Sequence, residues 1–165
     1  MNILGIDPGY ERLGVAIIKK ESDQESLVYS DCVETDRSLD HYTRLETVGK
    51  EIKKVINQFT PSLMAIETLL FNKNHKTALL VAEARGVVLF QAAVSGVEVY
   101  ELSPLQIKQA MTGYGRGEKK QVKEMVDRLI KPEKKIKHDD EYDAIAAALA
   151  AGADSLYLAR LKKTL

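Results

Sequence analysis

The sequence predicts an α/β protein with a central mixed sheet of five strands, flanked by helices on both faces. Three strand-like segments come first, and strand-like and helical segments then alternate toward the C-terminus. Strands joined by short turns form antiparallel pairs, whereas strands connected through a helix usually run parallel. Both arrangements in one chain therefore indicate a mixed sheet.

The first three predicted strands cover residues 2–7, 13–20 and 26–35. Residues 2–7 (NILGID) form a short apolar run that ends at a Pro8-Gly9 turn. Residues 13–20 (LGVAIIKK) follow closely, and residues 26–35 alternate loosely between apolar and polar side chains. This pattern is typical of an antiparallel meander.

The middle of the chain predicts a helix, a strand, a longer helix and another strand. Asp40 is suited to cap a helix that runs to Phe59, because apolar residues recur there at helical spacing. Residues 62–67 (SLMAIE) and 97–102 (VEVYEL) have strand character. Between them, a helix from about 74 to 95 is apolar around most of its circumference. It is therefore either fully buried or covers a sheet face on one side and a partner subunit on the other.

The last third of the chain predicts three helices. Ser103-Pro104 is a favourable helix start, and three glycines within residues 113–117 interrupt the pattern. A second helix covers about 118–130, and a final helix begins near Asp139.

The composition is that of one folded domain spanning residues 1–165. The chain is 45% hydrophobic and 29% charged, which supports a core and is unlike a disordered chain. Its longest uncharged apolar stretch, residues 86–97, has 12 residues, fewer than the ~18–20 that span a bilayer. The single cysteine, Cys32, excludes an internal disulfide framework and CxxC motifs. We therefore expect a cytoplasmic protein with no membrane association.

The charges are unevenly distributed, although the formal net charge is zero. Residues 104–138 carry 10 basic and 4 acidic side chains, and residues 139–143 (DDEYD) contain four acids. A lysine-rich segment is commonly a solvated surface. Beside an acidic cluster, it also suits a surface that binds phosphates next to a metal site. The neutral average therefore does not exclude a nucleic-acid ligand.

Four acidic residues occupy positions at which a site could form. Asp7 closes the first predicted strand and Glu67 closes the fourth, and ligands of α/β sheets gather beyond the carboxyl ends of strands. Asp140 and Asp143 are three residues apart at the start of the last helix, which places them on one face. Convergence of these four carboxylates would create a dense oxygen-rich site.

Each of these acids also has a purely structural interpretation. Asp7 would cap a turn, Glu67 would form a salt bridge, and the acids near residue 140 would stabilise a helix N-terminus. If the four meet, they suit Mg²⁺, a hard cation that prefers oxygen ligands. Two such ions, about 3.5–4 Å apart, can activate a water and stabilise the leaving oxygen of a phosphodiester.

Several short motifs follow one another in order along nearly the whole chain. They are GIDPG at 5–9, LGVAI at 13–17, AIE at 65–67, NKN at 72–74, EARG at 83–86, SPLQIKQAMTGYGRGEKKQV at 103–122 and DEYDAIAAA at 140–148. This ordered set resembles the RuvC family of Holliday-junction resolvases.

The resemblance implies a ribonuclease-H-like fold and a homodimer that resolves four-way DNA junctions in homologous recombination and repair. It implies paired symmetric nicks by two-metal hydrolysis, leaving a 5′-phosphate and a 3′-hydroxyl. Two Mg²⁺ ions per active site are implied as cofactors, with Mn²⁺ as a plausible substitute. A branch-migration helicase complex of the RuvA and RuvB type is implied as a partner.

The resemblance also assigns residues to the site. The catalytic and metal-binding acids are Asp7, Glu67, Asp140 and Asp143, with Asp7 bridging the ions. The DNA-binding residues are Leu70, Phe71, Lys73, Asn74, Lys108, Arg116, Lys119 and Lys120. Leu70 and Phe71 are alternative candidates for the family's stacking residue, and Asp139, Glu141 and His138 are further candidate ligands.

Three other functions are consistent with parts of the sequence. A small actin-like phosphotransferase relative also opens with a GIDxG turn, although it would leave the C-terminal acid pair without a role. A non-catalytic junction-binding dimer would share the fold but would not need all four acids. A related nuclease that acts on RNA is not distinguished by sequence.

Overall fold

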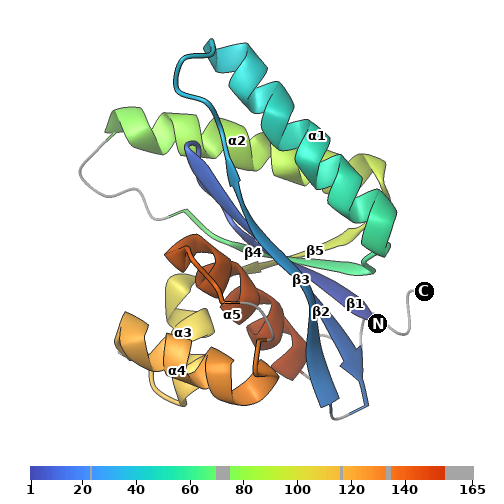
Figure 1. Ribbon diagram of the computed structural model, residues 1–165, viewed down its shortest axis with the longest axis vertical. Coiled ribbons are helices and arrows are strands. Elements are labelled where there is room, and N and C mark those ends of the chain that lie inside the picture. Colours follow the sequence, from blue (N-terminus) through green and yellow to red (C-terminus); the bar gives the residue numbers. More distant parts are fainter. Residues whose placement is uncertain (23, 70–74, 116, 133–134, 155–165) are drawn as a thin grey trace.

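The computed structural model describes residues 1–22, 24–69, 75–115, 117–132 and 135–154, which form one mixed sheet with helices on both faces (Figure 1). Five predicted DNA-binding residues, Leu70, Phe71, Lys73, Asn74 and Arg116, lie outside the described residues. The described elements are β1 (Asn2–Asp7), β2 (Arg12–Glu21), β3 (Gln24–Glu34), α1 (His41–Phe59), β4 (Leu63–Glu67), α2 (His75–Val94), β5 (Glu98–Leu102), α3 (Pro104–Thr112), α4 (Lys119–Ile130) and α5 (Asp139–Ala153). Their bounds agree with the predicted ranges to within two residues.

The strand order of the sheet is β3-β2-β1-β4-β5. β1 pairs antiparallel with β2, and β2 pairs antiparallel with β3, as expected for the meander. β4 pairs parallel with β1 and β5 pairs parallel with β4, because helices connect these strands. The predicted mixed five-stranded sheet is confirmed.

Alternating side chains of the central strands build two separate cores. Leu4 and Ile6 of β1 belong to the core that α1 and α2 cover on one sheet face. Ile3 belongs to the core that α3, α4 and α5 cover on the opposite face (Figure 1). Because side chains of a strand alternate between faces, Gly5 and Asp7 lie on the Ile3 side, facing α5.

The predicted helix starts are confirmed by their capping contacts. The Asp40 side chain accepts hydrogen bonds from the backbone N–H groups of Tyr42 and Thr43 at the start of α1. Ser103 and Gln106 form a reciprocal capping box at the start of α3. Each contact satisfies N–H groups that have no partner within the helix.

Helix α2 is covered on only part of its surface. Ala84, Val88 and Ala92 are fully buried, whereas Leu79, Phe90 and Val94 are 61–63% exposed. The alternative of a fully buried helix is therefore wrong, since α2 covers the sheet and α1 and leaves apolar side chains at the surface.

One window of α2, Thr77–Val94, is long and apolar enough to cross a membrane by length and composition alone. The window contains Glu83 and Arg85, which is why a search for uncharged stretches does not reveal it. In the structure both charges are paired, Glu83 with His41 of α1 and Arg85 with Glu101 of β5. The helix packs against α1 and the sheet through its buried residues.

Candidate active site

Asp7 and Glu67 meet at one edge of the sheet because the strands that carry them are parallel neighbours. Ile6 of β1 is in register with Ile66 of β4, so each strand places its acid one residue further on. Pro8 and Gly9 then turn the chain away, which leaves the carboxylate of Asp7 at the end of the strand. The backbone of Glu67 is held by Arg85 of α2, whose Nε donates to the Glu67 carbonyl oxygen at 3.3 Å.

Two glycines allow the first turns of α5 to lie directly on the sheet beside Asp7. A Cβ atom at Gly5 would stand 2.0 Å from the carbonyl oxygen of Ala144, and one at Gly14 would stand 1.9 Å from that of Asp140. Such distances exclude any side chain at these positions. Gly14 pairs with Asp7 across β1 and β2, so the same close approach brings Asp140 and Asp143 to Asp7.

The structure therefore brings together all four predicted acids, Asp7, Glu67, Asp140 and Asp143, which we call the carboxylate cluster. Burial, followed by the charges of Asp143, Glu67 and Asp140, raises the pKa of Asp7 to about 7 from its ordinary value of 3.8. Burial and the charge of Asp143 also raise the pKa of Glu67. Both pKa values are raised because the carboxylates are close together and partly shielded from solvent, which disfavours their charged forms.

Basic side chains of α3 and α4 face the carboxylate cluster across a pocket of about 260 Å³. Its charged lining consists of Glu67, Lys108, Lys119 and Asp143, and the rest is formed by Pro104, Ile107 and Val122. Lys119 Nζ lies 2.8 Å from Asp143 Oδ2. Burial works against the charge of Lys119, but its hydrogen bond to Asp143 and the nearby acids raise its pKa overall. The pocket thus combines acids with permanent positive charge.

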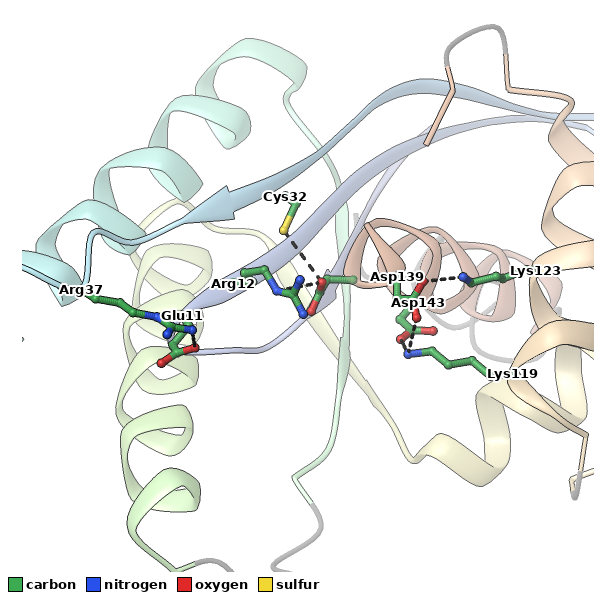
Figure 2. A network of polar contacts seen from close by, with 9 residues as sticks. Glu11, Arg12, Cys32, Arg37, Lys119, Lys123, Asp139 and Asp143 are labelled. Carbon is green, nitrogen blue, oxygen red and sulfur yellow. Dashed lines mark hydrogen bonds and ion pairs between the residues drawn. The ribbon is translucent and has the colours of Figure 1, made fainter. Parts of the chain in front are cut away.

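The N-terminus of α4 is joined to the N-terminus of α5 by ion pairs (Figure 2). Lys119 Nζ is 3.7 Å from Asp139 Oδ2, and Lys123 also pairs with Asp139. The Lys123 hydrogen bond lowers the pKa of Asp139. Lys120, a predicted DNA-binding residue, is exposed on α4, and Lys108 is half-buried on α3. The three described lysines of the prediction therefore surround or adjoin the pocket.

The further candidate ligands next to Asp140 have different environments. Asp139 is engaged by the two α4 lysines. Glu141 is only 4% exposed and accepts a hydrogen bond from Ser30 Oγ of β3 at 3.0 Å. His138 immediately precedes α5, and its side chain makes no capping hydrogen bond. Glu141 thus serves the packing of α5 on β3, while His138 lies beside the carboxylate cluster.

Two residues that contact Asp140 were not predicted from the sequence. Arg12 Nε lies 3.3 Å from Asp140 Oδ2, and the Cys32 thiol donates to the same oxygen at 4.0 Å. The two side chains converge in Figure 2. Burial, together with the charge of Asp140, raises the pKa of Cys32 to about 12. Only the register of β2 and β3 could have indicated these contacts, because both residues are far from Asp140 in sequence.

Cys32, His138 and Asp140 form a group whose ligand atoms lie within 4.8 Å of one another, so side chains able to hold a metal ion are present. The four acids of the carboxylate cluster form a separate all-oxygen set, in which Asp143, Glu67 and Asp140 are near enough to raise the pKa of Asp7. Its crowded charges, expressed in the raised pKa of Asp7, fit a site that is completed by a bound cation.

Comparisons with known proteins agree with this arrangement. The family profile described as crossover junction endodeoxyribonuclease RuvC matches residues 3–151. A protein of that name from Caldanaerobacter subterraneus is 42% identical over 149 residues, covering 90% of each chain. One from Moorella thermoacetica is 44% identical over 149 residues, covering 90% of this chain and 89% of the other. Thermus thermophilus RuvC superposes with a TM-score of 0.85 at 29% identity, covering 95% and 96% of the chains. The same protein in complex with a Holliday junction substrate gives a TM-score of 0.86 at 27% identity, with the same coverage.

Proposed function

This chain belongs to the RuvC family of crossover junction endodeoxyribonucleases, and on that basis we propose that it resolves four-way DNA junctions by paired symmetric nicks. The reaction is the hydrolysis of a phosphodiester bond during homologous recombination and DNA repair. The Thermus thermophilus relative with a Holliday junction substrate supports four-way junction DNA as the ligand. The ribonuclease-H-like fold is common to both proteins.

The observation that carries this proposal is one pocket lined both by two acids of the carboxylate cluster, Glu67 and Asp143, and by two lysines. The acids come from the ends of β1 and β4 and from the first turns of α5. Lys108 and Lys119 line the same pocket as Glu67 and Asp143. A phosphodiester group needs both kinds of charge, since lysines attract its oxygens and carboxylates hold the cations that assist hydrolysis.

We propose that Asp7, Glu67, Asp140 and Asp143 hold Mg²⁺, with two ions per active site and Mn²⁺ as a substitute. The donor set consists of carboxylate oxygens, which Mg²⁺ prefers. The raised pKa of Asp7 supports this assignment, because a nearby cation would offset the repulsion that raises it. When bound, Mg²⁺ supplies a Lewis acid that polarises the phosphoryl oxygen and makes a water more acidic.

The protein's own residues position the substrate for this chemistry. Lys119 Nζ lies 2.8 Å from Asp143 Oδ2, where it is placed to exchange that carboxylate for a phosphate oxygen. Lys108 lines the same pocket and is placed to neutralise a second phosphate charge. Exposed Lys120 extends the basic surface along α4. Leu70, Phe71, Lys73, Asn74 and Arg116 complete the proposed DNA-binding set by family resemblance.

Paired nicking needs two active sites, and we propose that two copies of this chain form the functional unit. The apolar side chains that α2 leaves exposed, including Leu79, Phe90 and Val94, support a contact between copies. A branch-migration complex of the RuvA and RuvB type and a cytoplasmic location are also proposed, both on the family resemblance.

The test compares synthetic four-way junctions with linear duplex DNA of the same sequence, in Mg²⁺ and in EDTA. We expect cutting of the junction alone, and only with Mg²⁺. Asp7→Asn should reduce cleavage by at least about 10²-fold while junction binding persists, because the lysines are untouched. Glu46→Gln, an exposed acid on α1 on the opposite sheet face, is the matched control and should cut normally.

Two results would refute the proposal. Equal cutting of junction and duplex would remove the claim of junction selectivity. If the Asp7→Asn variant cleaved the junction at the wild-type rate, the carboxylate cluster would be excluded as the catalytic site. Junction binding without any cleavage by the wild type would instead favour a non-catalytic binding dimer.

A further inference from the structure

A group of three metal-binding side chains lies at one end of the carboxylate cluster. The Sγ of Cys32, a ring nitrogen of His138 and a carboxylate oxygen of Asp140 are all within 4.8 Å of one another. Each residue is half-buried. They come from different parts of the chain, Cys32 from β3, His138 from the residue before α5, and Asp140 from the first turn of α5.

The backbone holds these three residues in place. Cys32 is the cross-strand partner of Gly14. Because Gly14 has no side chain, the carbonyl oxygen of Asp140 packs directly against β2. The thiol of Cys32, on the strand next to Gly14, donates to Asp140 Oδ2 at 4.0 Å. The side chains are therefore gathered before any ion binds, which reduces the ordering that binding requires.

The donor types differ from those of the carboxylate cluster. Mg²⁺ avoids sulfur and prefers oxygen, whereas a thiolate and an imidazole favour Zn²⁺ and other borderline-soft cations. Three protein ligands with one open position, filled by water, are typical of zinc sites that are not purely structural. Asp140 is common to both sets of side chains, so an ion held by one set would compete for it with an ion held by the other.

We propose that Cys32, His138 and Asp140 form a second metal site that takes a thiophilic divalent cation such as Zn²⁺. Binding forms a sulfur–metal bond and releases the thiol proton of Cys32 to solvent. It also displaces Arg12, whose side chain is 51% exposed and lies 3.3 Å from Asp140 Oδ2. Occupation of this site withdraws Asp140 from the carboxylate cluster and so inhibits cleavage, a consequence that rests on the proposed function.

The first experiment measures metal binding without DNA, using Co²⁺ as a spectroscopic substitute for Zn²⁺. The full-length protein should give a sulfur-to-cobalt charge-transfer band that Zn²⁺ removes by displacement. Cys32→Ser should abolish the band and weaken Zn²⁺ binding at least about tenfold, and His138→Gln should weaken it similarly. His41→Gln, which changes a histidine on α1, is the matched control and should leave the spectrum unchanged. Thermal unfolding of each variant shows that it is folded.

The second experiment measures inhibition of junction cleavage by Zn²⁺ at constant Mg²⁺. We expect micromolar Zn²⁺ to inhibit the wild type and Cys32→Ser to require at least about tenfold more for half-inhibition, each protein being compared with its own Mg²⁺-dependent rate without Zn²⁺. Equal inhibition of both proteins would place Zn²⁺ in the carboxylate cluster and overturn the inhibitory role. Absence of the charge-transfer band in the wild type would overturn the site itself. If the wild type cuts no DNA in Mg²⁺, the proposed function fails, while the cobalt experiment still decides whether the site exists.

Discussion

At the scale of single residues, the raised pKa of Asp7 shows how closely negative charge is crowded in the carboxylate cluster. The carboxyl group of Asp7 is half-buried and close to three other acids, whose effect on its pKa the charge of Lys119 opposes. Burial is the largest cause of its raised pKa, and the charge of Asp143 is the second. This raised pKa makes the stability of the metal-free protein depend on pH between about 4 and about 7.

We expect Asp7 to destabilise the metal-free protein progressively as the pH rises from about 4 to about 7. The folded state keeps the Asp7 proton up to about pH 7, whereas the unfolded chain loses it near 3.8. The folded state therefore binds more protons in this window, and the free energy of unfolding falls as pH rises. Below both values the effect vanishes. Denaturant unfolding in EDTA at several pH values measures it.

Asp7→Asn separates this contribution from other titrating groups, because asparagine resembles the protonated acid in shape and charge. At pH 8 the free energy of unfolding of the variant should exceed that of the wild type by roughly 2–4 kcal/mol. Each unit by which folding raises the pKa of Asp7 costs about 1.4 kcal/mol once the group is ionised. The two proteins should be nearly equal at pH 4. A wild type that is as stable as the variant throughout would show that Asp7 is not perturbed. Mg²⁺ should stabilise the wild type more than the variant.

The positions of individual acids were visible in the sequence, but their neighbours were not. Asp7 and Glu67 stand out because each ends an apolar strand. Arg12 and Cys32 carry no such signal, since their contact with Asp140 depends on the register of β2 and β3 and on the packing of α5. Pairs this far apart in sequence become neighbours only when the sheet has formed.

At the scale of elements, the position of α5 decides whether the carboxylate cluster exists. The helix packs on β1 and β2 at Gly5 and Gly14. Its backbone carbonyl groups occupy the space that a side chain at either glycine would need. The helix itself was predicted from the apolar run after Asp143, and its face from the three-residue spacing of the acids. Its distance from the sheet follows from the two glycines, whose importance becomes apparent only once the register is known.

Gly14→Ala should disturb α5 and the site together. A Cβ atom there would stand 1.9 Å from the Asp140 carbonyl oxygen, so the first turn of α5 must move away from Asp7. We expect a loss of about 1–3 kcal/mol in unfolding free energy and a marked loss of cleavage. Chemical denaturation and the junction assay measure the two effects.

Gly86→Ala is the matched substitution for this prediction. Gly86 lies within α2, and a Cβ atom there would meet nothing within 4 Å. Alanine in a helix interior should stabilise the protein by up to ~1 kcal/mol, because it restricts the unfolded chain and favours the helix. Equal behaviour of the two variants would show that the close approach at Gly14 has no influence on stability.

At the scale of the whole molecule, different helices cover the two faces of the sheet, and the pocket lies on one of them. Helices α3, α4 and α5 build the pocket on one face, and α1 and α2 cover the other. Helix α2, which carries exposed apolar side chains, lies on the opposite side of the sheet from the pocket's helices (Figure 1). A contact between copies through α2 would leave the pocket and its lysines accessible to DNA.

The double variant Phe90→Asp/Val94→Asp should shift the protein from dimer to monomer, because burying new charges in an apolar interface is unfavourable. Light scattering coupled to gel filtration measures the mass. Leu129→Asp, which charges an apolar residue of α4 that is 50% exposed, is the control and should not change the mass. A wild type that is monomeric at all concentrations would contradict the proposed assembly.

The assignment of residues 1–165 to a single domain also stays a prediction.

By itself, the sequence determined the identity and order of the strands and helices and the two capped helix starts, and it singled out four acids that the fold brings together. These features depend on neighbouring residues, whose spacing and backbone preferences are readable locally. The strand order, the partial exposure of α2, the contacts of Arg12 and Cys32 and the raised pKa of Asp7 were decided by the tertiary structure. The physical reason is that burial and charge at one atom depend on segments far apart in the chain, which meet only when α5 packs on the sheet.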